Sequence, residues 1–75
     1  MTTKEFKKEI ESMKSGEVVF INAINLSVKQ INILIEYVKS GVLVPDIESV
    51  KAMCKDVDGA MQGRFLLPQM EYIKA

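Results

Sequence analysis

The chain has 75 residues, of which 48% are hydrophobic, and its ten basic and ten acidic residues cancel to a net charge of zero. This length allows one domain with one core and excludes two. Zero net charge, with Arg64 as the only arginine, argues against a general nucleic-acid binder, whose affinity depends on clustered positive charge.

The single cysteine, Cys54, cannot form an internal disulfide, which favours a reducing environment. The charged N-terminal residues do not resemble a secretory signal. All apolar runs are far shorter than the ~20 residues that span a bilayer. We therefore expect a soluble, cytoplasmic protein that does not enter a membrane.

The N-terminal segment is predicted to form a helix that stops at Gly16. Thr2 and Glu5 have the spacing of a capping box. One narrow apolar stripe follows at helical spacing, made by Phe6, Ile10 and Met13.

Residues 17–23 are rich in β-branched and aromatic side chains, which predicts a short strand. A buried helical extension is also compatible with so short a run. The second helix is predicted to begin at Ser27, which forms a capping box with Gln30, and to end at Gly41. Its apolar residues cover more than one side, which indicates a central helix.

Residues 42–44 form an apolar connector or a short strand that Pro45 ends. Asp46 is the predicted N-cap of a third helix. This helix is expected to continue to Gln62, although an end near Asp58 is also compatible with the pattern. Its apolar positions are Ile47, Val50, Cys54, Val57 and Met61.

The C-terminal segment, residues 64–74, is predicted to form a strand that is apolar on both faces. Pro68 excludes that part of the strand from a central position in a sheet. A 75-residue chain has little material to cover both faces, so a second copy is the expected cover. One face would carry Phe65, Leu67 and Ile73, and the other Leu66, Met70 and Tyr72.

The predicted fold class is therefore α+β, a single domain of residues 1–75 with three helices and a small antiparallel sheet. The predicted order is helix, strand, helix, helix, strand. Two strands alone are marginally stable, so the sheet is expected to be completed across a homodimer.

No motif in the sequence predicts catalysis or a cofactor. The chain has no histidine, and one thiol cannot build a zinc site. Asp56 and Asp58 lie two residues apart, so on a helix they would not face each other. Cys54 shares an apolar stripe with Val50 and Val57, which favours a packing role. We therefore expect neither an enzyme nor a metal protein.

These observations favour a small non-catalytic accessory protein that binds another macromolecule as a homodimer. Such a protein would act as a regulator, an adaptor or an inhibitor, and small proteins encoded by phages and mobile elements often have this profile. The predicted partner-binding residues are Phe65, Leu67, Met70 and Tyr72, although Phe65 and Leu67 would suit the core equally well.

A nucleic-acid alternative depends on the order of the predicted elements, which resembles that of a winged-helix domain. The resemblance implies a third helix that reads DNA with Lys51 and Lys55, and a wing near Arg64 and Lys74. Four acidic residues on or beside that helix would repel phosphates, namely Asp46, Glu48, Asp56 and Asp58. Capture of a small anionic ligand between subunits, through Arg64 and lysines, is a third possibility.

Overall fold

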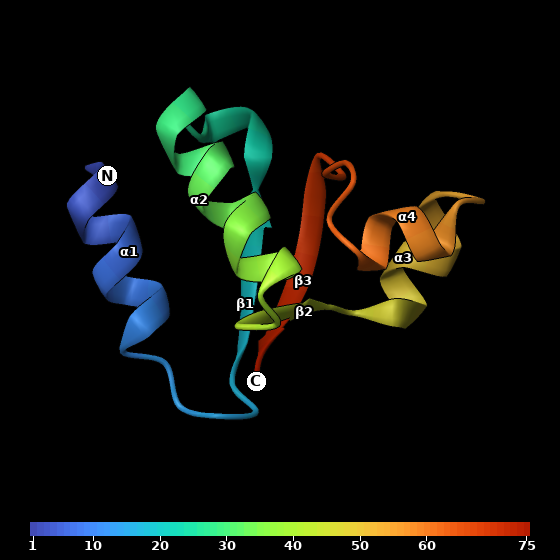
Figure 1. The fold of residues 1–75 in the computed structure, drawn as a ribbon, viewed down its shortest axis with the longest axis horizontal. Coiled ribbons are helices and arrows are strands. Elements are labelled where there is room, and N and C mark those ends of the chain that lie inside the picture. Colours follow the sequence, from blue (N-terminus) through green and yellow to red (C-terminus); the bar gives the residue numbers. More distant parts are fainter.

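A computed structural model describes all residues, 1–75, and confirms the predicted α+β class. Four α-helices accompany a three-stranded antiparallel sheet with the strand order β1-β3-β2 (Figure 1). None of the helices has the length and apolar character needed to cross a membrane. In chain order the elements are α1 (Thr3–Glu11), β1 (Val18–Asn22), the 3-10 helix η1 (Ala23–Asn25), α2 (Val28–Lys39), β2 (Leu43–Pro45), α3 (Ile47–Met53), α4 (Val57–Met61) and β3 (Gln69–Lys74).

Both predicted capping boxes are present. The Glu5 backbone N–H donates to the Thr2 hydroxyl at 3.1 Å, and the Glu5 carboxylate accepts from the Thr2 N–H at 3.0 Å. The bond from the Thr2 backbone N–H to the carboxylate holds the pKa of the Glu5 carboxyl below its usual value. Ser27 and Gln30 make the same reciprocal pair at the start of α2. Two otherwise unsatisfied N–H groups at each helix start are thereby bonded.

The prediction of one long third helix is wrong, because the helix breaks in two after Met53. Cys54 has extended backbone angles (φ −150°, ψ 161°), and the Asp56 carboxylate accepts from the Gly59 N–H at 3.0 Å to begin α4. The apolar stripe continues through the break, so periodicity alone did not reveal it. Asp46 is the N-cap of α3 as predicted, but its carboxylate accepts from the Ser49 hydroxyl instead of a helix N–H.

The predicted strand over residues 64–74 is shorter in the structure and begins at Gln69, directly after Pro68. Residues 64–68 form an irregular connection from α4. A proline before the first strand residue removes no hydrogen bond from the ladder, so β3 can be the central strand. The connector at residues 42–44 contributes to β2, which supplies the third strand.

One face of the sheet lies against the helices and forms the core. The register places Ile21 of β1 opposite Met70 of β3, and Pro45 of β2 opposite Tyr72. Figure 1 shows α2 crossing the sheet, with α1 on one side of it and the α3–α4 pair on the other. The buried apolar residues are Phe6, Ile10, Ile21, Leu34, Val38, Leu43, Val50, Ala60, Met70 and Tyr72.

The opposite face of the sheet has no helix over it. Alternate residues of each strand point to this side, which we call the outer face. The side chains of Val18 and Phe20 are 57% and 60% exposed, and that of Val44 is 39% exposed. The register places Asn22, Val44, Gln69, Glu71 and Ile73 on the same face.

Candidate functional site

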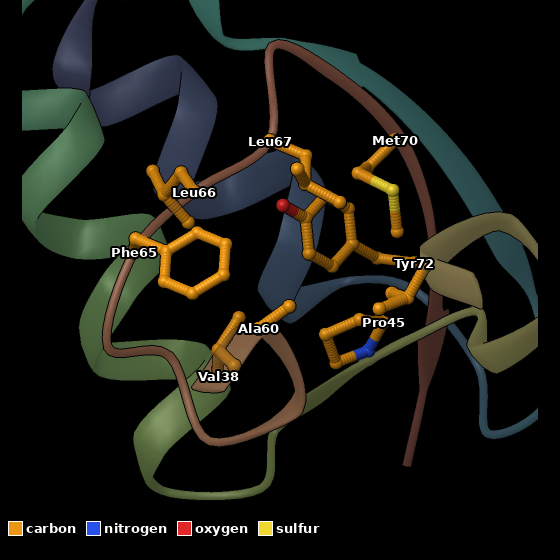
Figure 2. Close-up of a pocket in the computed structure, with 9 residues that line it drawn as sticks. Val38, Pro45, Ala60, Phe65, Leu66, Leu67, Met70 and Tyr72 are labelled. Carbon is orange, nitrogen blue, oxygen red and sulfur yellow. The ribbon is translucent and has the colours of Figure 1, made fainter. Parts of the chain in front are cut away.

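The four residues predicted to bind a partner lie around one small cavity (Figure 2). Phe65 and Leu67 come from the connection before β3, and Met70 and Tyr72 come from β3 itself. The cavity measures about 10 Å³, which is room for one water molecule at most. This cluster is therefore a packed part of the core and not a pocket for a ligand.

Two of the four residues are enclosed by their own chain. The side chains of Met70 and Tyr72 are each 2% exposed, so in this conformation they cannot contact a partner. Helices α2, α3 and α4 together cover this face of β3, and the apolar pattern of the strand alone does not reveal such a cover. Burial raises the pKa of the Tyr72 phenol to about 12, because the charged form would lose its hydration.

The other two residues lie at the boundary of the core. Phe65 is 37% exposed, and Leu67 is half-buried against the core. Gly59 of α4 makes room for the aromatic ring, since a Cβ atom at this glycine would lie 2.8 Å from Phe65 Cε1. Phe65 therefore packs over α4 and presents only one side to solvent.

The outer face holds the most exposed apolar side chains of the sheet, and the sequence argument did not assign them a binding role. The signal was present, because Val18 and Phe20 alternate with Val19 and Ile21 along one strand. Glu71 is the charged residue on this face, and it lies opposite Phe20. The surface is therefore apolar with one carboxylate and no cation.

The structure does not gather the four proposed nucleic-acid residues into one surface. Lys51, Lys55 and Arg64 are exposed, but Lys55 lies in the break between α3 and α4 instead of on a reading helix. The Lys74 ammonium donates to the carbonyl oxygen of Ile10 at 2.9 Å and also reaches two further carbonyls at the end of α1. Lys74 is thus engaged in holding α1, where a cation complements the helix dipole.

The element order also differs from the one on which the winged-helix resemblance depended. Strand β2 lies between the second and third helices, and β3 pairs with strands on both sides. The resemblance to a winged-helix domain therefore does not extend to the observed topology.

Chemically reactive side chains are dispersed. Three or more histidine, cysteine, aspartate or glutamate side chains nowhere meet in a group that could hold a metal ion. Cys54 is half-buried against the core, with its Sγ atom 3.7 Å from the carbonyl oxygen of Asp56. The Tyr37 hydroxyl donates to the Glu11 carboxylate at 3.0 Å and links α2 to α1. Partial burial and this carboxylate raise the pKa of Tyr37 to about 12.

Comparison with protein-family models, curated proteins and solved structures gave no match for this chain.

Proposed function

We propose that this chain is a non-catalytic accessory protein that binds another protein through the outer face of its sheet, as a regulator, an adaptor or an inhibitor. The observation that carries the proposal is the uncovered apolar patch formed by Val18, Phe20 and Val44. A cytoplasmic location belongs to the same proposal and is supported by the single free thiol.

The composition of this face suits a protein interface. Phe20 is a large, exposed aromatic side chain that a partner can cover, and aromatic residues supply a large share of binding energy at interfaces. Polar residues border it at one end of the strands, where Asn22 lies opposite Gln69. An apolar centre with a polar rim is the common pattern of a binding surface.

A different protein suits this face better than a second copy of the chain. Two identical outer faces packed together would enclose Glu71 from both copies without a cation to pair with either. A partner that supplies a lysine or arginine would neutralise this carboxylate. The expected homodimer consequently has less support than a heteromeric complex.

The proposal is tested by affinity enrichment from the native host with wild-type protein and with the double variant Phe20→Lys, Val44→Lys. Lys29→Glu, an exposed change on α2, is the matched control. The wild type and the control should retain the same partner, and the outer-face variant should bind that purified partner about tenfold or more weakly. Equal affinity of all three proteins would refute the proposal.

Binding of a second copy and binding of nucleic acid would each give a distinct experimental result. Sedimentation that shows a dimer lost in the outer-face variant would identify a second copy as the occupant. The nucleic-acid alternative requires that the protein bind duplex DNA. This binding must weaken as salt is added and also in the double variant Lys51→Glu, Lys55→Glu. An electrophoretic shift assay at low salt measures it directly.

A further inference from the structure

Strand β1 lies at an edge of the sheet, and its own sequence lacks the features that keep natural edges from pairing. The strand Val18–Asn22 contains neither a proline nor a charged residue. Edge strands of monomeric proteins are usually short, charged, bulged or interrupted by proline. This strand has five residues in continuous register with β3.

The backbone hydrogen bonds show which groups of β1 are free. The Ala23 N–H donates to the Pro68 carbonyl at 2.8 Å, and the Glu17 carbonyl accepts from the Lys74 N–H at 2.8 Å. Bonded pairs occur at every second residue of an antiparallel ladder, so residues 19 and 21 also bond to β3. The N–H and C=O groups of residues 18 and 20 therefore point away from the sheet.

The other edge of the sheet is protected. Strand β2 has three residues, and the Asp46 N–H next to it donates to the Glu71 carbonyl at 2.9 Å. The same alternation places Pro45 at an outward position, where it offers no N–H to a new strand. Only the β1 edge is therefore suited to pairing.

A groove runs along the free side of β1 from Val19 to Asn22, so that Val18 lies just beyond its end, and α1 forms its wall. It has a volume of about 180 Å³ and is lined mainly by apolar side chains. Consecutive strand residues 19–22 all line it, which means that the backbone edge itself faces the groove. We call this hollow the edge groove; its principal lining residues are Phe6, Glu9, Ile10, Val19, Ile21 and Leu26.

We infer that the partner supplies an extended segment that adds to β1 as a fourth strand in the edge groove. This inference depends on the proposed function and specifies how the partner is held. Main-chain bonds to residues 18 and 20 give affinity, and alternate side chains of the segment fill the apolar groove. Glu9 is the charged residue that lines the groove, so the segment carries a lysine or arginine opposite it.

The geometry favours a thin segment over a second copy of the chain. Paired strands lie only ~4.8 Å apart, whereas a helix with its side chains is ~10 Å wide. Each copy carries α1 beside the same edge of β1. A two-fold pairing of β1 with its equivalent would bring both α1 helices into the same space. An extended peptide meets no such obstacle.

The test selects short random peptides on the immobilised full-length chain and measures the Kd of the best one by fluorescence anisotropy. Enriched peptides should alternate apolar residues with one basic residue. Val18→Pro, which removes an outward N–H without removing a bond to β3, should weaken binding about tenfold. Val18→Ala keeps that N–H and shortens only one side chain of the outer face, so it should weaken binding clearly less than Val18→Pro. Glu9→Lys should weaken a basic peptide by about two- to fivefold.

Amide hydrogen exchange gives a second measurement that does not depend on the fold of any variant. In wild-type protein the peptide should slow exchange at Val18 and Phe20. A peptide that instead slows exchange at Val44 and Ile73 alone would overturn this inference and leave the outer-face proposal intact.

Protection of the β1 amides that grows with protein concentration in the absence of peptide would show that a second copy pairs with the edge. If the selection enriches no peptide, the inference is also overturned. If the double variant Phe20→Lys, Val44→Lys still binds the partner as the wild type does, both proposals are overturned.

Discussion

The assignment of inner and outer sheet faces can be tested with two neighbouring residues of β1. Ile21 is 6% exposed and faces the helices, whereas Phe20 is 60% exposed on the outer face. Ile21→Ala removes buried methyl groups and leaves a cavity, which costs about 2–5 kcal/mol. Phe20→Ala removes a ring that is roughly 40% buried. Because full burial of phenylalanine is worth about 1.5–3 kcal/mol, this loss is about 0.6–1.2 kcal/mol.

Urea unfolding followed by circular dichroism measures both free energies. A domain of this size has a total stability of about 4–11 kcal/mol and an m-value near 1 kcal/mol per M. Ile21→Ala should therefore lower the midpoint by about 2 M or more, and Phe20→Ala by about 1 M or less. Ile21→Val, expected to cost about 0.5–1.5 kcal/mol, keeps the comparison measurable if the alanine variant does not fold. Equal or reversed losses would show that β1 is shifted by one residue, since such a slip exchanges the two faces.

Further measurements address the helix contacts and the tyrosines. Lys74→Met should destabilise the fold by about 1.5–3 kcal/mol, because charged hydrogen bonds to the end of α1 are lost, and hydrogen exchange should increase first in α1. Ser27→Ala should cost about 1 kcal/mol in urea unfolding through loss of the α2 cap, whereas a change below a few tenths would contradict the capping role. Tyr72 has a folded-state pKa raised from 10 to about 12, so its stabilising contribution is complete below pH 10 and is lost as the pH rises towards 12. Tyr72→Phe should reduce this loss of stability at alkaline pH. A tyrosinate absorbance titration in which Tyr37 and Tyr72 both have midpoints near 10 would disprove the shift.

The local elements could be predicted well where short-range chemistry determines them. The capping pairs Thr2–Glu5 and Ser27–Gln30 are recognisable from residue type and spacing, and both helices begin where these pairs indicate. The strand over residues 18–22 follows from its β-branched and aromatic composition.

The break after Met53 was harder to predict because a regular apolar stripe crosses it. Asp56 competes as an N-cap, and its bond to Gly59 is visible only once the chain is folded. The positions of Met70 and Tyr72 were missed for a different reason. Whether a strand face is covered depends on helices distant in sequence, and the pattern of β3 alone does not reveal them.

The candidate site illustrates the same limit. The residues predicted to bind a partner belong to a segment that is apolar on both strand faces, and the fold uses that segment to build part of its core. The exposed edge of β1 could not be recognised without the strand order β1-β3-β2, since β1 would have a neighbour on both sides if it were the central strand.

The central strand of the sheet is also the last one that the ribosome makes. Strands β1 and β2 have no contact partner in the sheet until residues 69–74 have emerged, so neither can be incorporated while translation of this region is unfinished. Lys74, which holds the end of α1, is synthesised later still than the rest of β3. The nascent chain therefore exposes the uncharged sequence of β1 until residues 69–74 have emerged, and we expect chaperones to engage it during this interval.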